Sequence, residues 1–304
     1  MTSAALRPAL AAAFLWAAAS AAFAQAPGAP PAASAPRPPL VVKNVKPGLF
    51  MIVGAGGNTT VRVTGDGLVL VDSKNPGQPI YDELVGDVKT ISGEPVKYLI
   101  DTHIHADHTG NNGRFEAAGV KVVGQKNIPV ELAKFVPPAN NPTLQAPAAP
   151  NVTYDTTYEI KLGGKTVKLN HFANGHTNGD TVVYFPDLKV VAMGDEFVAV
   201  TPNCDYGGGG SIGGWLNSLD QTMKLDWDLA IPGHGDNPLT KADMKVFRDK
   251  WATFLDRAKA AVKAGATKDK LVAAIKTDDL WTFNPNAWTG ARLDGLYAEA
   301  GGKS

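Results

Sequence analysis

Residues 102–110 of the chain are Thr102-His103-Ile104-His105-Ala106-Asp107-His108-Thr109-Gly110. Three imidazoles and one carboxylate thus fall within six residues, soon after a hydrophobic run at 96–100 that is typical of a buried strand. These four side chains cannot all converge on a strand or a regular helix, but they can on a tight loop that leaves a strand end. Since imidazole and carboxylate are ligands expected for zinc, the stretch predicts a metal site. An incidental His-rich loop is the alternative, but three of the chain's six histidines lie here.

The composition of the 304-residue chain is that of an ordinary globular protein, with 44% hydrophobic and 19% charged residues. The length allows one large domain or two small ones. Lys and Arg together number 29, as do Asp and Glu, so the charges cancel. Because neither sign is in excess, we expect a small-molecule substrate as the partner, and neither nucleic acid nor a membrane surface. The oligomeric state is left open.

The N-terminus has the features of a secretory signal peptide over residues 1–24. Arg7 is followed by an apolar segment over 10–21, which is shorter than the ~20 residues of a spanning helix, and then by Ala22-Phe23-Ala24, a typical cleavage site. Cleavage predicts a periplasmic or secreted protein, and an uncleaved anchor is the alternative. Residues 25–39 are rich in Ala and Pro and predict an extended linker, so we expect one folded domain over 40–304.

The first half predicts a β-meander followed by alternating strands and helices. Strands are expected over 41–42, 49–53, 59–63, 67–71, 96–100 and 120–123, and helices over 76–91, 114–118 and 128–135. Residues 137–150 are rich in Pro, Asn and Ala and predict a surface loop, either a lid or substrate wall or a simple insertion.

The second half predicts a similar alternation. Strands are expected over 153–162, 166–172, 181–185, 190–193 and 228–231, and helices over 211–225, 240–264, 267–275 and 289–300. Gly207–Gly210 is a run of four glycines without the spacing or the lysine of a phosphate-binding loop, so it predicts a mobile turn. Cys204 is the only cysteine, which excludes an intrachain disulfide. It is expected to be an unpaired small side chain, with a place near a metal as the alternative.

Three further candidate ligands, His176, Asp195 and His234, lie beside predicted strands, and a glycine precedes each one. Glycine lets the backbone come close to a crowded polar site. Together with the opening stretch they make seven ligands, too many for one tetrahedral zinc and suited to two ions that share a carboxylate. A natural division assigns His103, His105 and His176 to one ion, assigns Asp107, His108 and His234 to the other, and makes Asp195 the bridge.

The order of these motifs resembles the metallo-β-lactamase fold superfamily. H-x-H-x-D-H at 103–108 is followed by G-H-T at 175–177, G-D at 194–195 and P-G-H-G at 232–235. The resemblance covers about 40–264. It implies an α+β fold, an αββα sandwich in which two mixed β-sheets carry helices on both outer faces and hold the metals at one edge. The predicted order of strands and helices agrees with this architecture.

The identity of residue 195 as Asp indicates which members of the superfamily the chain resembles. Members that hydrolyse β-lactam antibiotics typically carry Cys or Ser at this position, whereas an Asp is similar to the glyoxalase II-type thioesterases and the lactonases. The basic glutathione-binding residues of a glyoxalase II are not evident in the predicted C-terminal helices. The tyrosine that some lactonases place shortly after this Asp is also absent, since Val198 stands three residues on. The subfamily therefore stays open.

Two residues are candidates for supporting the ligands. Asp72, at the end of a predicted strand, resembles the family's carboxylate that orients a ligating imidazole. His171 lies five residues before His176 and is either a substrate or support contact or an ordinary hydrogen-bonded strand histidine.

These features predict a hydrolase with two zinc ions, for which iron or manganese could substitute. A hydroxide activated by the ions would attack an ester, thioester, lactone or amide carbonyl, and Asp107 would orient the hydroxide or accept its proton. A side-chain nucleophile is not needed, and the chain has no G-x-S-x-G motif. The alternatives are a mononuclear iron oxygenase similar to the persulfide dioxygenases of the superfamily, β-lactamase activity on a non-standard ligand set, and a binding module without catalysis.

Overall fold

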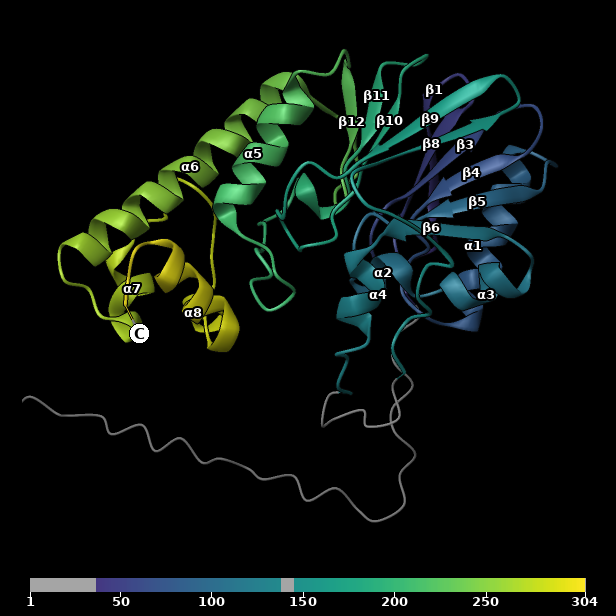
Figure 1. Ribbon diagram of the computed structural model, residues 1–304. Coiled ribbons are helices and arrows are strands. Elements are labelled where there is room, and N and C mark those ends of the chain that lie inside the picture. The colour runs from purple at the N-terminus through teal and green to yellow at the C-terminus, as the bar shows by residue number, and fades with distance from the viewer. Residues whose placement is uncertain (1–36, 138–144, 304) are drawn as a thin grey trace, which may run out of the picture. The chain divides into compact units, whose positions relative to one another are not determined.

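Two β-sheets lie face to face in the structure, a computed structural model that describes residues 37–137 and 145–303 (Figure 1). Helices cover the outer faces of both sheets, so the αββα sandwich expected from the sequence is confirmed. The chain from Pro38 onward forms one compact unit. The predicted signal peptide and nearly all of the predicted linker lie outside the described residues.

The first sheet has seven strands that follow one another in sequence order. Its first four strands pair antiparallel, and the last three are parallel to the fourth. The strands are β1 (Val41–Lys46), β2 (Leu49–Val53), β3 (Thr59–Val63), β4 (Leu68–Val71), β5 (Val96–Ile100), β6 (Lys121–Gln125) and β7 (Val152–Tyr154).

The second sheet has six strands in the order β13-β12-β11-β10-β9-β8. All neighbours pair antiparallel except β11 and β12, which are parallel. The strands are β8 (Thr157–Leu162), β9 (Lys165–Asn170), β10 (Val182–Phe185), β11 (Val190–Ala192), β12 (Leu229–Ile231) and β13 (Leu239–Thr240).

One predicted strand was wrong in extent: the segment 153–162 is two strands, not one. It contains the end of β7, which belongs to the first sheet, and β8, which begins the second. The chain turns at Asp155 and Thr156, both exposed, and the carbonyl of Thr156 accepts a hydrogen bond from His171 at 2.9 Å. Local β propensity runs through this turn, and only the distant partner strands decide which sheet each half joins.

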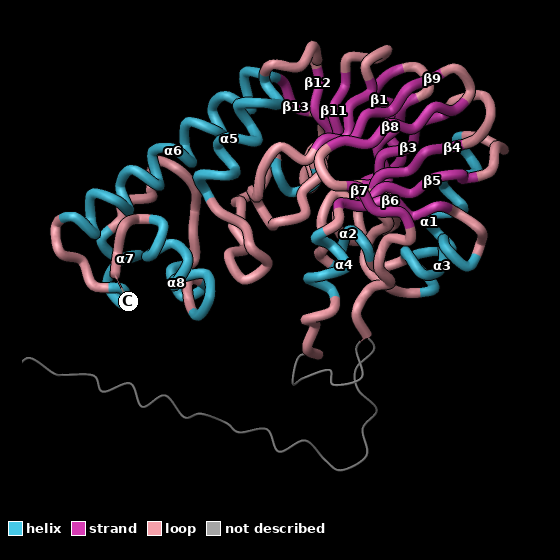
Figure 2. The backbone as a smooth tube through the Cα atoms, in the orientation of Figure 1, coloured by secondary structure: helices cyan, strands magenta, loops and turns pink. Residues whose placement is uncertain are grey.

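The helices separate into two groups (Figure 2). Those of the first half are α1 (Gln78–Ile91), α2 (Ala106–Thr109), α3 (Asn112–Ala117) and α4 (Asn127–Leu132), and those of the second half are α5 (Ile212–Met223), α6 (Lys241–Lys263), α7 (Lys268–Ala274) and α8 (Gly290–Glu299). Ser211 and Thr240 cap α5 and α6 as expected, since each side chain accepts a backbone N–H of the first turn. No helix in the described part of the chain has both the length and the apolarity to cross a membrane.

Strand β4 shows how the layers are built, because all four of its side chains are buried. Val69 and Val71 pack between the two sheets, against residues such as Phe185. Leu68 and Leu70 point the other way and pack under Leu84 of α1. Successive strand side chains point to opposite faces, so a strand covered on both sides is apolar throughout. A third group of buried side chains joins the second sheet to α5 and α6.

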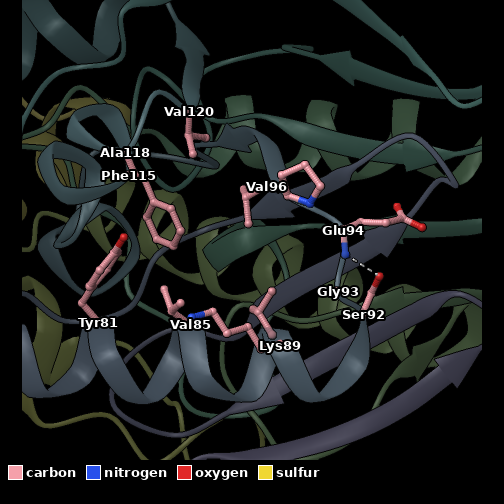
Figure 3. A pocket seen from close by; sticks show the side chains of 12 residues that line it. Tyr81, Val85, Lys89, Ser92, Gly93, Glu94, Val96, Phe115, Ala118 and Val120 are labelled. Carbon is pink, nitrogen blue, oxygen red and sulfur yellow. Dashed lines mark hydrogen bonds between the residues drawn. The ribbon is translucent and has the colours of Figure 1, made fainter.

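An apolar pocket of about 280 Å³ lies between α1 and α3 (Figure 3). Tyr81 and Val85 of α1, Phe115 of α3 and Val96 of β5 line it, and the rings of Tyr81 and Phe115 meet edge to face at 5.1 Å. None of the residues that line this pocket is a predicted ligand, so it is separate from the site described next.

Candidate metal centre

All seven predicted ligands lie at one edge of the two sheets. Strands β4 and β5 are parallel, so Asp72 and the His-rich loop leave the first sheet at the same edge. In the second sheet, parallel β11 and β12 end just before Asp195 and His234. Strand β10 is antiparallel to β11, so the loop that carries His176 enters β10 at this same edge. Strand direction alone thus brings distant segments together.

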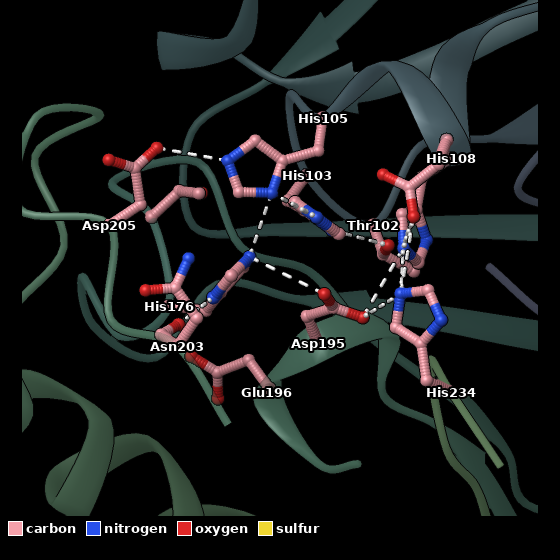
Figure 4. A network of polar contacts seen from close by, with 12 residues as sticks. Thr102, His103, His105, His108, His176, Asp195, Glu196, Asn203, Asp205 and His234 are labelled. Atoms are coloured by element: carbon pink, nitrogen blue, oxygen red, sulfur yellow. Dashed lines mark hydrogen bonds and ion pairs between the residues drawn. The ribbon is translucent and has the colours of Figure 1, made fainter. Parts of the chain in front are cut away.

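The first cluster is formed by His103, His105 and His176 (Figure 4). Nδ1 of His105 lies 3.1 Å from Nε2 of His103 and 3.0 Å from Nε2 of His176. His103 and His176 are buried, whereas the side chain of His105 is 29% exposed. With a carboxylate oxygen of Asp195, the ligand atoms all lie within 4.8 Å of one another, as one metal ion would require.

The second cluster is formed by Asp107, His108 and His234. Nε2 of His108 lies 3.3 Å from Nε2 of His234. Oδ2 of Asp107 lies 3.2 Å from Nε2 of His234 and 3.6 Å from Nε2 of His108. Five histidines and Asp107, together with Asp195, therefore lie in the two groups that the sequence predicted.

Asp195 lies between the clusters. Its Oδ1 lies 3.2 Å from Nε2 of His108 and 3.3 Å from Nε2 of His234, in the second cluster. Its Oδ2 lies 3.7 Å from Nε2 of His176, in the first. Each oxygen of one carboxylate thus faces a different cluster, which is the arrangement that a bridging ligand needs.

The electrostatics differ between the clusters. Burial, together with the neighbouring imidazoles, holds the pKa of His103 well below its usual range, and burial and His105 also lower the pKa of His176. Burial would lower the pKa of His108 too, but the Asp195 and Asp72 carboxylates outweigh it and raise that pKa well above its usual range. The pKa of His234 is raised to about 9, because its contacts with Asp107 and Asp195 outweigh burial. Without metal, the raised pKa values favour the charged form of His108 and His234 in the second cluster, whereas the lowered pKa values favour the neutral form of His103 and His176 in the first.

Asp72 supports the second cluster, as the resemblance implied. Its Oδ2 accepts a hydrogen bond from Nδ1 of His108 at 2.7 Å, and its two oxygens also accept from the backbone and hydroxyl of Thr102, both at 2.8 Å. The bond leaves Nε2 of His108 facing the cluster. His171 does not reach the cluster: its Nδ1 bonds to the backbone carbonyl of Asp180 at 2.8 Å, which is the ordinary strand role.

The three glycines that precede ligands allow the close packing expected of them. A Cβ added at Gly233 would lie 2.2 Å from Oδ1 of Asp195, and one at Gly194 would lie 2.3 Å from Oγ1 of Thr102. A Cβ at Gly175 would lie 1.9 Å from Oε1 of Glu196. The site thus excludes any side chain at these positions.

The sequence did not reveal that Asp205 contacts His105. Its Oδ2 lies 2.9 Å from Nε2 of His105, and its Oδ1 accepts the backbone N–H of Gly208 at 3.0 Å. Burial would raise the pKa of Asp205, but the bond to His105 outweighs it and lowers the pKa to about 2, so the carboxylate is ionised. Asp205 stands two residues before the glycine run, and nothing in that local sequence points to His105.

The glycine run Gly207–Gly210 lies in a turn, as the sequence predicted, and it packs against the site. A Cβ at Gly210 would lie 2.4 Å from the carbonyl oxygen of His176, and one at Gly209 would lie 2.7 Å from Nδ2 of Asn178. The backbone N–H of Asn178 also donates to the carbonyl of Gly208 at 3.0 Å. Glycine is required here because the run lies directly on the backbone of the His176 loop. Cys204, next to Asp205, is buried and unpaired.

Two further polar residues support the ligand loops. The side chain of Asn58 donates to the carbonyls of Pro232 and Gly235 at 3.0 and 2.9 Å, which holds the loop of His234. Asp180 accepts the backbone N–H groups of Gly175 at 3.0 Å and of Thr177 at 2.9 Å, on either side of His176. Neither residue has a local pattern that marks it as part of a site.

A sequence profile of the metallo-beta-lactamase superfamily matches residues 53–234, more than half of the chain and every one of the seven ligand positions. The chain belongs to the metallo-beta-lactamase superfamily. This confirms the resemblance on which the fold was predicted.

The individual relatives are distant. The alpha subunit of 2,4-dinitroanisole O-demethylase from Nocardioides sp. (strain JS1661) is 26% identical over 186 residues, which cover 60% of this chain and 53% of that protein. A type 2 metallo-beta-lactamase from Elizabethkingia meningoseptica is 27% identical over 183 residues, which cover 59% of this chain and 69% of that protein. This chain thus spans only about half the length of the first of these relatives.

Among solved structures, a metallo-beta-lactamase from Pontibacter korlensis superimposes with a TM-score of 0.58. It is 21% identical, and the match covers 68% of this chain and 95% of that one. At this level of identity the similarity shows a shared fold and gives no information about the substrate.

The residues present suit zinc. Neutral imidazole and ionised carboxylate are zinc ligands, and the low pKa values of His103, His176 and Asp195 keep each of these groups in the form that binds metal. Oδ1 of Asp195 is buried and accepts no hydrogen bond, although two imidazole nitrogens lie within 3.3 Å. A buried carboxylate oxygen without a hydrogen bond requires a partner, and a cation at this point would supply one.

Proposed function

We propose that the protein is a dinuclear zinc hydrolase that adds water to an ester, thioester, lactone or amide carbonyl. The observation that carries this proposal is the position of Asp195, whose two oxygens face the two clusters separately. Residues His103, His105 and His176 would hold one ion, Asp107, His108 and His234 the other, and Asp195 both. Zinc bound there would polarise the carbonyl and lower the pKa of water toward ~7.

Asp107 is the residue best suited to handle the proton of the attacking water. Its Oδ2 contacts the ring nitrogens of His108 and His234, and its side chain is 31% exposed, so water can reach it. Burial would raise the pKa of Asp107, but the His234 and His108 contacts outweigh it and lower that pKa, so the carboxylate is ionised at neutral pH. It can orient a water molecule and accept its proton as oxygen attacks the carbonyl carbon. The bond to the leaving group then breaks, and the proton passes to that group.

Metal analysis is the first test. Protein purified in zinc-containing medium should hold about two equivalents of zinc, and well under one equivalent of any transition metal would contradict the proposal. Asp195→Ala should bind fewer ions and lose most turnover, whereas Asp66→Ala, at an exposed turn position, should change neither. Full activity of Asp195→Ala would remove the dinuclear assignment.

A turnover screen then identifies the substrate class. The zinc-loaded protein should hydrolyse at least one of a set of esters, thioesters, lactones and β-lactams. The alternative, a mononuclear iron oxygenase, predicts coloured protein with an EPR signal and one iron per chain. The intact second cluster favours the hydrolase, since a single-iron enzyme would leave Asp107, His108 and His234 without a ligand role.

The N-terminal sequence supports a further proposal, that the enzyme acts after export. A tagged full-length chain expressed in a Gram-negative host should be recovered from the periplasm, shortened by the 24 residues before Gln25. A full-length protein found only in the cytoplasm would contradict this.

A further inference from the structure

A pocket of about 340 Å³ opens beside His105 and Asp205, next to the first cluster. Its walls come from three described parts of the chain: the His-rich loop, residues of 131–135 together with Pro147, and the segment 205–208. Small-molecule sites start at about this volume. A second pocket, of about 260 Å³, adjoins Asp195 and His234 on the other cluster. Two pockets thus lie beside the candidate metal centre, one next to each cluster.

The walls of the pocket beside His105 are mainly apolar. Ile104, Leu132, Phe135 and Pro147 line it, and each is only half-buried in the protein itself. Such side chains gain from being covered by an apolar ligand, at about 25 cal/mol for each Å² removed from water.

The polar side chains in these walls already have partners. Oδ2 of Asp205 bonds to His105 and its Oδ1 to the N–H of Gly208. Glu131, whose side chain is only 7% exposed, accepts hydrogen bonds from Lys134 at 2.8 Å and from Asn178 at 2.7 Å. A polar ligand group that enters would lose its water and find these groups engaged, so the pocket favours hydrocarbon.

The charge of the lining also disfavours an anionic ligand. Among the described residues that line the pocket, Lys134 is the only Lys or Arg, and its Nζ is already paired with Glu131. The carboxylates of Glu131 and Asp205 lie in the same walls, so an anionic chain would meet like charge there.

We infer that this pocket binds the hydrocarbon part of the substrate, and that the enzyme acts on neutral esters, thioesters or lactones with an unbranched or aromatic apolar acyl group. This inference rests on the proposed function and deepens it. The reacting carbonyl would lie at the metal centre, with its apolar chain in the pocket between Leu132, Phe135 and Pro147.

A chain-length series tests the inference on the zinc-loaded, full-length protein. The substrates are nitrophenyl acetate, butyrate, hexanoate and octanoate, with the nitrophenyl ester of adipic acid as the anionic counterpart of the hexanoate. We expect kcat/KM to rise about fourfold per buried methylene until the pocket is full, and to fall at least tenfold for the adipate ester. Equal rates across the series, or a preference for the adipate ester, would overturn the inference and leave the hydrolase standing. No hydrolysis of any carbonyl substrate by protein holding two metals would remove both.

Variants of Leu132 test whether the dependence of kcat/KM on acyl chain length arises in this pocket. Leu132→Trp should lower the octanoate-to-acetate ratio of kcat/KM at least tenfold, because the indole occupies the pocket. Leu132→Ala, which removes bulk and does not depend on fitting a larger ring, should shift the preferred chain one or two carbons longer. Val85→Trp in the separate pocket between α1 and α3 is the matched control and should keep the wild-type ratio. If wild type and both Leu132 variants, each shown to be folded by circular dichroism, gave the same ratio, the acyl chain of the substrate would bind elsewhere. That result would overturn the inference.

A binding measurement checks the pocket without turnover. In methyl NMR spectra of the zinc-loaded protein, octan-1-ol should shift the signals of Ile104 and Leu132, and ethanol at the same concentration should not. Shifts confined to Val85 would place the apolar ligand in the other pocket and contradict the inference.

Discussion

Oδ2 of Asp205 lies 2.9 Å from Nε2 of His105, the ring nitrogen that faces away from His103 and His176. An ionised carboxylate holds a proton on that nitrogen, so Nδ1 carries the lone pair and points at the first cluster. His103 has the opposite arrangement, because its Nδ1 contacts the Thr102 hydroxyl at 3.0 Å and its Nε2 faces the cluster. Neighbouring ligands thus use different nitrogens, each selected by its own partner.

Replacing Asp205 should therefore weaken one metal site and spare the other. Asp205→Asn keeps the shape but loses the negative charge, and we expect the affinity of the first cluster for zinc to fall about 10- to 100-fold. Competitive titration with a chelator would measure the two affinities. Asp66→Asn, at an exposed turn position, makes the same charge change and should have no effect. Equal weakening of both sites would indicate a general loss of structure.

Asp72→Asn is the reciprocal experiment. Asp72 has a left-handed backbone with φ of 63°, which Asn tolerates well, so the substitution mainly removes charge. The hydrogen bond that orients His108 is weakened, and the second cluster should lose about 10- to 100-fold in zinc affinity while the first is retained. Cobalt substitution followed by visible spectroscopy would report each site separately. A spectrum in which only the first site changes would contradict the assignment of His108 to the second.

The glycine run should tolerate no side chain where it covers His176. Gly210→Ala places a Cβ 2.4 Å from the carbonyl oxygen of His176 and 2.7 Å from that of Gly175, so the backbone must move. We expect a loss of about 1–3 kcal/mol in unfolding free energy, measured by urea denaturation, together with weaker zinc binding at the first cluster. Gly93→Ala is the control, because its Cβ would meet nothing within 4 Å. A Gly210→Ala protein as stable as Gly93→Ala would show that the run is indeed loose.

The sequence predicted which side chains gather in the two clusters, because histidine is rare in this chain and a glycine precedes each of His176, Asp195 and His234. Strand β5 at Val96–Ile100 was also placed to the residue, since four of its five side chains are apolar, although only Leu99 and Ile100 are buried. What the sequence missed depends on distant partners. Asp205 contacts a residue 100 positions away, and no local pattern announces that contact.

One wrong prediction and one incomplete prediction have the same physical origin. The turn at Asp155 separates strands of different sheets, but the residues on both sides have equal strand propensity. The run Gly207–Gly210 was predicted to be mobile because glycine is conformationally permissive, yet glycine is also the residue that close backbone packing demands. Composition cannot distinguish these two uses, and only the position of the His176 loop does.

Zinc binding at the second cluster should release protons. Contacts with Asp107 and Asp195 outweigh burial and raise the pKa of His234 to about 9, and the pKa of His108 is raised as well, so both rings are protonated in the metal-free protein at pH 7. Metal binds only the neutral ring, so affinity should increase as the pH rises from 7 through about 9. Calorimetric titration in buffers of different ionisation enthalpy would measure the protons released. His103 and His176 of the first cluster should release none, since burial lowers their pKa values.

Lys74 should make stability depend on pH for a reason unrelated to metal. Its side chain is fully buried, and Nζ donates hydrogen bonds to the carbonyls of Ile52 and Gly57 at 2.5 and 2.8 Å. Burial lowers its pKa from 10.5 to about 7, despite the opposing charge of Asp72. Between these two values the unfolded chain binds the proton and the folded chain does not, so stability rises with pH by up to about 1.4 kcal/mol per unit.

Below pH 7 both states are protonated and the slope from Lys74 disappears. Lys74→Met should remove this dependence, so the difference in unfolding free energy between wild type and variant should move in favour of wild type from pH 7 to pH 10. Urea denaturation at several pH values measures it, and the shared metal site cancels in the difference. Lys270→Met, at an exposed position of α7, should leave the wild-type slope unchanged. A constant difference between wild type and Lys74→Met across this range would show that the Lys74 amine stays charged in the folded protein, held so by Asp72 and the two carbonyls.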